Sequence, residues 1–112
     1  MFYHVATQEE WRTAREQGRF TPESLGIDGY IHNCRREQIL WVVERFYAGQ
    51  MELVILCIAE ERLAAPWREE DLDNLGQTFP HIYGPLNLEA VVDVVPLSSG
   101  AGGQIKLPGN LP

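Results

Sequence analysis

The sequence predicts an α+β fold in which a small, mainly antiparallel sheet, curved or split, packs with two principal helices. Three apolar runs have the length and composition of strands, and they cover residues 2–6, 53–59 and 90–97. Two further segments carry helix signals: a capping sequence before residue 8 and an apolar stripe at helical spacing after residue 38. Because 112 residues is the size of one ordinary domain, we expect a single domain over residues 1–112.

The first helix is predicted from the residues that precede it. Residues 2–6 form a short apolar and aromatic run that is typical of a strand. Thr7 follows as a helix N-cap, and Glu10 stands three residues later, which completes a capping box. We therefore expect a helix over residues 8–17, ended by Gly18.

The second helix follows a loop and a short strand. Residues 20–29 contain one proline and two glycines and are predicted to form a loop with one helical turn, and residues 30–34 are predicted to be a strand. From Arg35 onward the apolar residues fall at the spacing of one helix face. These residues are Ile39, Val42, Val43 and Phe46. We expect this helix to run from Arg35 to a stop at Gly49.

The second half of the chain is predicted to be mostly strands and loops. Residues 53–59 are continuously apolar, which is typical of a central strand covered on both faces. Residues 60–77 are predicted to be a long acidic loop with a short helix around residues 69–74. A strand and a turn are expected within residues 79–88, and a further strand over residues 90–97. The end of the chain, residues 97–112, is expected to form a glycine-rich turn and an edge strand.

Composition and charge exclude several functions. The net charge of -7, from 16 acidic and 9 basic residues, repels phosphate backbones, so we expect no binding of duplex nucleic acid. No apolar run is long enough to span a bilayer, and residues 1–20 lack a signal pattern, so we expect a cytoplasmic, bacterial protein without a membrane partner. Cys34 and Cys57 are predicted to be reduced thiols.

The three histidines, His4, His32 and His81, are the candidate catalytic residues, and we expect them to converge on one polar pocket. A single histidine in an apolar segment is most often a half-buried structural residue. Here all three lie in apolar, aromatic surroundings and none lies in a charged stretch, which favours a shared site for a small-molecule ligand.

Strand geometry adds neighbours to these histidines. Alternate residues of a strand share a face, so Tyr30, His32 and Cys34 lie on one face and His81 and Tyr83 on another. Tyr30, Cys34 and Tyr83 are therefore candidate binding residues beside the histidines.

Sharper chemical alternatives are less well supported. No metal is expected, because the histidine and cysteine spacing fits no common zinc motif. The interpretation of Cys34 as a nucleophile is less well supported than its interpretation as a small buried thiol. Residues 71–76 hint at a calcium loop but lack its later ligands, and a solvated loop is the better interpretation.

Two further side chains suggest a ligand without establishing one. Arg35 and Arg36 begin the second helix, where they and free backbone N–H groups could hold an anion, although a plain surface role is equally well supported. The three tryptophans are predicted to be core or pocket-wall residues, and Trp67, which lies in the long acidic loop where a large apolar side chain is unusual, is also a candidate lid.

Four sequence blocks together resemble the bacterial domain-of-unknown-function family 952. They are FYHVAT at the start, GYIHNC followed by REQ, PHIYGPLNLEAVV and GGQIKLP near the end, and they cover essentially the whole chain in the same order. The family is in turn distantly similar to the ADP-ribosyltransferase fold, and its nearest branch looks like the RNA 2′-phosphotransferases. Those enzymes carry a histidine in their first strand and a second strand of the type HIHLA, which His4 and His32 match.

The resemblance implies a binding site for NAD or an NAD-derived ligand and a glycosyl or ADP-ribosyl transfer. By this resemblance His4 contacts a ribose, and the strand of His32 holds the nicotinamide end. The chain departs from the pattern, because Asn33, Cys34 and Arg35 replace a Cys-Ser-Thr-like run and the catalytic glutamate has no counterpart. The alternative is a non-catalytic small-molecule or protein-interaction domain that kept the fold and lost the chemistry.

Overall fold

A computed structural model describes residues 1–50, 52–97, 107–109 and 111–112 as an α+β fold. The strands are β1 (Phe2–Thr7), β2 (Arg19–Phe20), β3 (Ile31–His32), β4 (Leu53–Ile58), β5 (Trp67–Glu70), β6 (Phe79–Ile82), β7 (Leu86–Asn87) and β8 (Val91–Leu97). The helices are α1 (Gln8–Gln17), α2 (Glu23–Asp28) and α3 (Ile39–Phe46), and short 3-10 turns cover Arg36–Gln38, Glu60–Arg62 and Leu88–Ala90.

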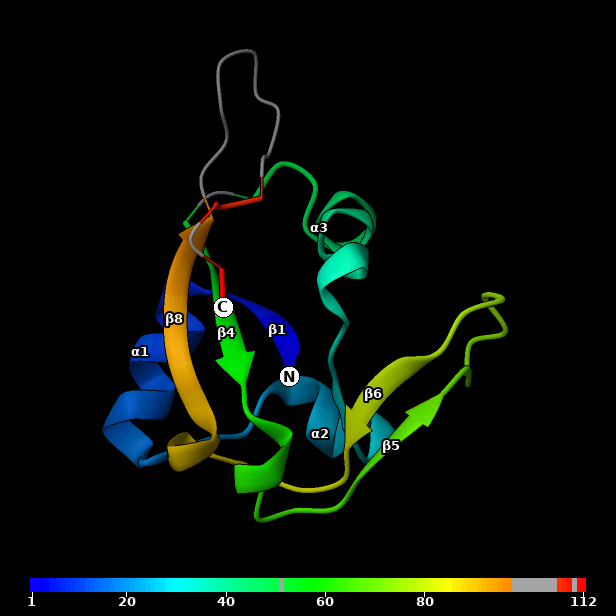
Figure 1. Ribbon diagram of the computed structural model, residues 1–112. Coiled ribbons are helices and arrows are strands. Elements are labelled where there is room, and N and C mark those ends of the chain that lie inside the picture. Colours follow the sequence, from blue (N-terminus) through cyan, green and yellow to red (C-terminus); the bar gives the residue numbers. More distant parts are fainter. Residues whose placement is uncertain (51, 98–106, 110) are drawn as a thin grey trace.

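The strands form three small sheets, ordered β1-β4-β8, β2-β7 and β3-β6-β5 (Figure 1). Every strand pairing in the described residues is antiparallel, so the predicted α+β class with a mainly antiparallel, split sheet is confirmed. A backbone bridge between Tyr3 and Cys34 connects two of these sheets: each residue donates its N–H to the other's carbonyl at 2.8 Å.

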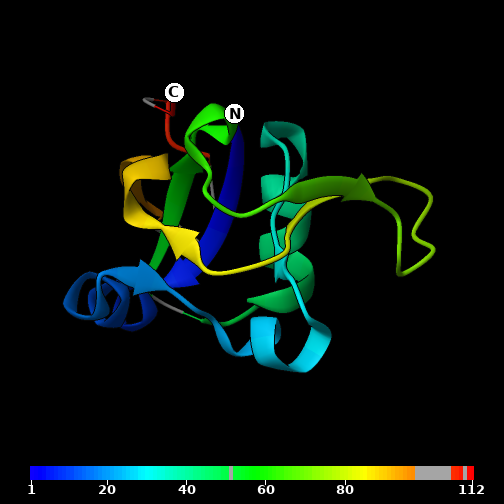
Figure 2. The same ribbon diagram turned by 90° about the horizontal axis from the view of Figure 1, so that it is seen from below.

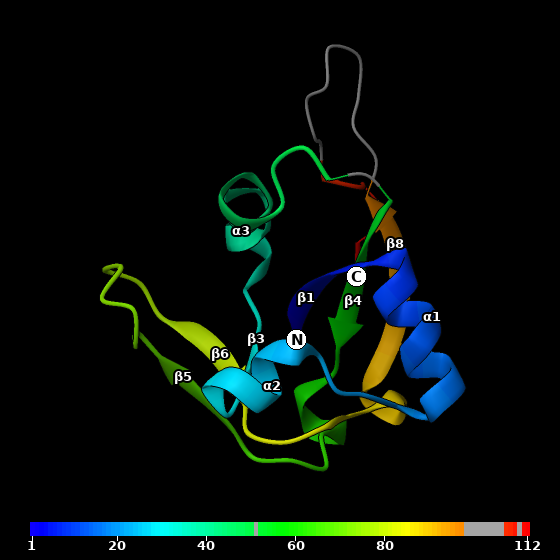
Figure 3. The same ribbon diagram turned by 180° about the vertical axis from the view of Figure 1, so that it is seen from behind.

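The predicted central strand is confirmed in β4, which lies between β1 and β8 and is buried along its whole length. Its alternate side chains enter two cores. Leu56 packs with Phe2 and Ala14 on one face, whereas Ile55 packs with Ile39 on the other. Helices α1 and α3 accordingly lie on opposite sides of β1 and β4 (Figure 3). The apolar run therefore reflects a strand that is covered on both faces.

Helix α1 begins and ends where the sequence predicts. The Thr7 side chain accepts a hydrogen bond from the Glu10 N–H at 3.1 Å, and Glu10 accepts one from the Thr7 N–H at 2.9 Å. Gly18 ends the helix in the left-handed region, with φ of 83°. Such caps act within a few residues of chain, which explains why the sequence alone was sufficient here.

The second predicted helix begins later and ends earlier than expected. Residues Arg36–Gln38 form a 3-10 turn, and the α-helix covers Ile39–Phe46, three residues short of Gly49. The Gln38 side chain accepts the Arg35 N–H at 2.8 Å and donates to the Thr78 carbonyl at 2.9 Å. This bond to a distant loop holds the first turn, so the start of the helix depends on tertiary contacts.

The short helix predicted around residues 69–74 is wrong. Residues Trp67–Glu70 instead form β5, which pairs with β6 and places Arg68 opposite His81. Pairing with a neighbouring strand outweighs weak local propensity. The acidic residues that follow make a turn, because the Asp71 carboxylate accepts N–H groups of Leu75 and Gly76 at 2.7 and 2.9 Å. The turn and edge strand predicted for the end of the chain fall on residues 98–106, outside the described residues.

The two ends of the chain lie close together beside β1 and β4, as the view from below shows (Figure 2). The Tyr3 hydroxyl donates to the Pro112 carbonyl at 2.5 Å, and the Arg36 guanidinium donates to the Leu111 carbonyl at 3.2 Å. Within the described ranges, none of the helices has the length and apolar character needed to cross a membrane.

Candidate functional site

The three histidines line one cavity of about 320 Å³, which we call the histidine pocket. His32 in β3 is paired directly with His81 in β6, and their ring centroids lie 5.5 Å apart. His4 in β1 joins them because the bridge between Tyr3 and Cys34 brings the edge of β1 beside β3. The structure thus brings the predicted histidines together, and their chemical roles remain predictions.

His4 is held in one orientation and one tautomer. Its Nδ1 lies 2.6 Å from the His32 carbonyl oxygen, and since a carbonyl only accepts, Nδ1 carries the proton. Burial lowers the pKa of His4, and this effect outweighs the His32 carbonyl and the Glu10 carboxylate, which favour the charged ring. The neutral ring therefore leaves Nε2 as a hydrogen-bond acceptor.

His81 and His32 form an aromatic cluster with Tyr30, in which His81 is stacked on the tyrosine ring and His32 is tilted against it. The Tyr30 ring lies 4.3 Å from the His81 ring at an angle of 30°, and 4.8 Å from the His32 ring. His32 Nε2 is 2.8 Å from the Asp28 carboxylate, which lies on α2. Each ring is thus held by an aromatic contact and by a carboxylate partner, since His81 contacts Glu70 at 3.2 Å.

Glu70 is a functional candidate that the sequence did not reveal. Its carboxylate accepts the Tyr83 hydroxyl as well as His81 Nδ1. The Tyr83 hydrogen bond, more than the His81 contact, lowers the pKa of Glu70. A carboxylate that bonds one imidazole nitrogen fixes the ring and the tautomer. Tyr83 and Tyr30 lie behind His81, outside the residues that line the pocket.

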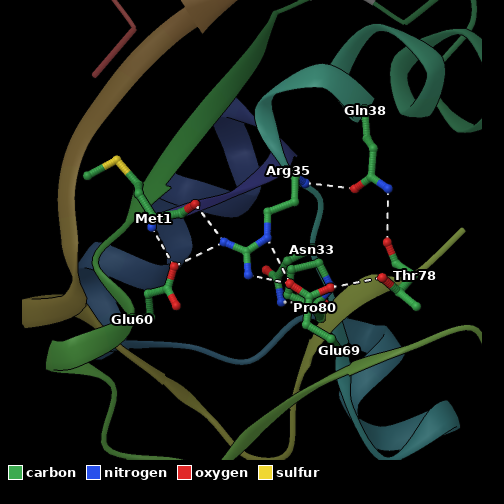
Figure 4. A network of polar contacts seen from close by, with 8 residues as sticks. All are labelled: Met1, Asn33, Arg35, Gln38, Glu60, Glu69, Thr78 and Pro80. Carbon is green, nitrogen blue, oxygen red and sulfur yellow. Dashed lines mark hydrogen bonds and ion pairs between the residues drawn. The ribbon is translucent and has the colours of Figure 1, made fainter.

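Asn33 carries an unpaired buried acceptor at the histidine pocket. Its side-chain N–H groups donate to the Ile31 carbonyl at 3.0 Å and to the Pro80 carbonyl at 3.3 Å, and Figure 4 shows the contact with Pro80. These two carbonyls fix which side of the amide is nitrogen. The carbonyl oxygen Oδ1, in a residue only 5% exposed, has no hydrogen-bond partner in the described part of the chain.

The remaining walls are aromatic and acidic. Besides the histidines, five aromatic residues border the pocket: Tyr3, Trp41, Phe46, Tyr47 and Phe79. Trp41 and Phe79 stack on each other with ring centroids 5.6 Å apart. Three carboxylates also border it, namely Glu10, Glu23 and Asp73, and the described lining residues include no lysine or arginine. The walls therefore suit flat rings and repel anions.

Cys34 borders the pocket but is a poor nucleophile. The thiol is free and buried, and burial raises its pKa to about 12. Because the thiolate is the reactive form, such a thiol stays protonated at neutral pH. Cys57 is likewise free and buried. The described residues contain no group of three or more histidine, cysteine or carboxylate side chains arranged to hold a metal ion.

The expected roles of Arg35 and Trp67 are corrected by the structure. Arg35 holds no free anion site, because its guanidinium pairs with Glu60 and Glu69 and donates to the Met1 carbonyl (Figure 4). Trp67 lies 5.2 Å from the Phe2 ring, packs on the core and does not border the pocket, so it does not serve as a lid.

The fold has solved relatives. The crystal structure of protein CC0527 from Caulobacter crescentus is similar over 95% of this chain and 93% of that chain, with a TM-score of 0.84 and 32% identity. The solution NMR structure of the same protein has a TM-score of 0.72 and 30% identity over 93% of this chain and 89% of that chain. No curated protein matches the chain.

A family model also matches, and it covers residues 5–94, which include His32 and His81, whereas His4 lies one residue before the match. Its description is "Protein of unknown function (DUF952)". The match spans most of the chain and includes the segments that carry His32 and His81. The chain therefore belongs to the DUF952 family.

Proposed function

We propose that this chain binds a small ring compound in the histidine pocket, and that the ligand is the nicotinamide–ribose end of NAD or of an NAD-derived molecule. One observation carries the proposal: three imidazoles border one cavity, and each has one ring nitrogen bonded to the protein. Rings held in this way present their other nitrogen in a fixed position, which is what orientation of a ligand requires.

The pocket suits part of NAD and not all of it. A volume of about 320 Å³ is at the lower end of small-molecule sites, which is room for a nucleoside-sized group. The stacked walls of Trp41 and Phe79 suit a pyridine ring, and the acceptors on His4 and Asn33 suit ribose hydroxyls or a carboxamide. The described residues of the lining include no lysine or arginine that could bind a pyrophosphate, so the phosphates would lie outside.

Within this proposal His4 orients the ribose, His32 holds the nicotinamide end and His81 closes the site, whereas Tyr83 acts only through Glu70, which contacts His81. When bound, NAD supplies a nicotinamide–ribose bond whose cleavage builds positive charge on the sugar. The carboxylates of Glu23 and Asp73, which border the pocket, would stabilise that positive charge by electrostatic attraction.

A second candidate is a binding domain without catalysis. It is favoured by the state of the reactive groups: the Cys34 thiol is protonated, and the Glu70 carboxylate is occupied by Tyr83 and His81. Neither group is free to attack or to take a proton from an acceptor.

Titration with nicotinamide riboside, followed by NMR, tests the proposal. We expect shifts at the rings of His4, His32 and His81, and loss of binding by about tenfold or more in His4→Gln, which removes the imidazole acceptor. Trp67→Phe is the matched control, because Trp67 lies outside the pocket and should leave binding unchanged. No shift at millimolar ligand would reject the proposal. Release of nicotinamide from NAD would then separate an enzyme from a binder.

A further inference from the structure

The charges around the histidine pocket all have one sign. Glu10, Glu23 and Asp73 border it, and no lysine or arginine appears among its described lining residues. Glu10 acts on the pocket interior, because its carboxylate favours the protonated form of the His4 ring. A wall of this kind attracts cations and repels phosphate or carboxylate groups.

The buried polar groups of the pocket favour a ligand that donates hydrogen bonds, as positively charged ligands do. Asn33 Oδ1 is an acceptor without a donor, and its amide is held by two carbonyls that exclude the reversed orientation. An unpaired buried acceptor costs roughly 1–3 kcal/mol, which a ligand N–H or O–H can recover. An acceptor in a residue 5% exposed is thus an independent sign of a ligand that donates.

His4 adds a second acceptor next to the first. Its Nδ1 proton is committed to the His32 carbonyl, which leaves the lone pair on Nε2. The Asn33 amide lies within hydrogen-bond reach of the His4 ring and so favours its charged form, but the neutral ring has no proton on Nε2 to donate to Asn33 Oδ1. Two neighbouring acceptors repel each other unless a donor group lies between them.

From these observations we infer that the histidine pocket takes a compact ring compound that carries positive charge and hydrogen-bond donors, and that it rejects ligands whose bound part carries a phosphate or carboxylate. The inference rests on the proposed function, since both concern one cavity, and it narrows the ligand class. The nicotinamide riboside cation belongs to this class, whereas nicotinic acid riboside, whose ring carries a carboxylate in place of the carboxamide, does not.

Three probes of the same shape test the charge preference: benzamidine, benzamide and benzoate, which are a cation, a neutral amide and an anion. Titration of the full chain at low ionic strength, followed by NMR, should rank them in that order. We expect the dissociation constant for benzamidine to be at least about tenfold below that for benzoate. The Asn33 side-chain N–H signals and the His4 ring should shift with benzamidine.

Equal or tighter binding of benzoate overturns the inference, and so does benzamidine that shifts no resonance of the pocket. A second comparison separates the inference from the proposed function. If benzamidine binds and neither nicotinamide riboside nor its mononucleotide does, the proposed function fails and the inference stands. If nicotinic acid riboside binds as tightly as nicotinamide riboside, the proposed function stands and the inference fails.

Variants of two carboxylates in the lining locate the charge effect. Glu23→Gln and Asp73→Asn alter exposed side chains of the lining, and together they should weaken benzamidine binding roughly twofold to tenfold, with benzamide unaffected. Glu44→Gln with Glu61→Gln is the matched control, since it makes the same change in net charge at exposed positions away from the pocket. Equal weakening by both pairs would show a field of the whole protein and would overturn a role for the pocket carboxylates.

Discussion

The β1-β4-β8 sheet and the β3-β6-β5 sheet differ in regularity and in the polarity of the side chains that they bury. The first has long, regular pairings, with β1 and β4 joined over six residues and β4 buried throughout. The second has strands of two and four residues, and its core positions include His81 beside half-buried His32, Tyr30 and Glu70. The comparison teaches that the apolar sheet supplies the stable frame, whereas the shorter sheet places polar groups whose burial costs stability.

The two regions share an apolar cluster, in which Ile31 of β3 and Ile82 of β6 pack with Leu56 of β4, and polar contacts also join them. The backbone bridge between Tyr3 and Cys34 is one, and the guanidinium of Arg35 is another, since it reaches Glu60 on the side of β4 and Glu69 on β5. The next experiments either break this division or make it sharper.

The largest change in the free energy of unfolding is expected from a substitution in the β1-β4-β8 sheet. Leu56→Ala removes a fully buried side chain from the central strand, and it should lower the free energy of unfolding by about 2–5 kcal/mol. Denaturant unfolding measures this. Val92→Ala, at a position 41% exposed on β8, should change it by less than about 0.5 kcal/mol. A small loss in Leu56→Ala would show that the frame is not where the stability lies.

The connection between the two regions comes next. Arg35→Ala leaves Glu60 and Glu69 without their shared cation, and since these side chains are 25–34% exposed we expect a loss of roughly 1–2 kcal/mol. Arg35→Lys should lose less, because it keeps the charge but not the planar fork. The measurement is thermal unfolding at low and high salt. A loss that is identical for the two variants would contradict a role for the forked geometry.

We expect the stability of the fold to depend on pH through His4 of β1, which borders the pocket. Burial lowers the pKa of His4, so below about pH 6.5 the unfolded chain takes up a proton that the folded chain refuses. Stability is therefore complete above that pH and falls as the pH drops below it, by up to about 1.4 kcal/mol for each pH unit. Unfolding at pH 7.5 and 5.5 should show the loss, and His4→Gln should reduce it.

A direct measurement serves as the control for this prediction. The His4 ring signals, followed by NMR through the same pH range in the folded protein, should remain those of a neutral imidazole below pH 6.5. Carboxylates such as Glu60, whose pKa is lowered mainly by its bond to the chain amino terminus, lose their contribution only at lower pH. A His4 ring that becomes charged near pH 6.5 would remove the physical basis of the expected loss.

The smallest effect is expected behind the pocket. Tyr83→Phe removes the hydroxyl that donates to Glu70, so the pKa of Glu70 should rise toward its ordinary value. NMR titration of the carboxyl carbon measures this shift. The unfolding midpoint should hardly move, because both groups are partly exposed. A large loss of stability would mean that the shorter sheet also acts as a frame.

Local signals predicted part of the fold well. The capping box of Thr7 and Glu10 fixed the start of α1, and the apolar run of residues 53–59 identified β4 as a central strand. In both cases the physical cause lies within one short segment. The strand β5 escaped prediction because Trp67–Glu70 is acidic and becomes a strand only by pairing with β6. Glu70 escaped for the same reason, since nothing in the sequence places it beside His81.

By itself, the sequence determined the α+β class, the membership in one family and the three histidines as candidates, because these follow from local patterns and from motif blocks. The tertiary structure decided the rest. It set the register of β3 and β6, which pairs His32 with His81. It also placed the His32 carbonyl where it fixes the tautomer of His4, and it left the side-chain oxygen of Asn33 without a hydrogen-bond partner in the described residues. These features depend on contacts between segments tens of residues apart, which no local pattern encodes.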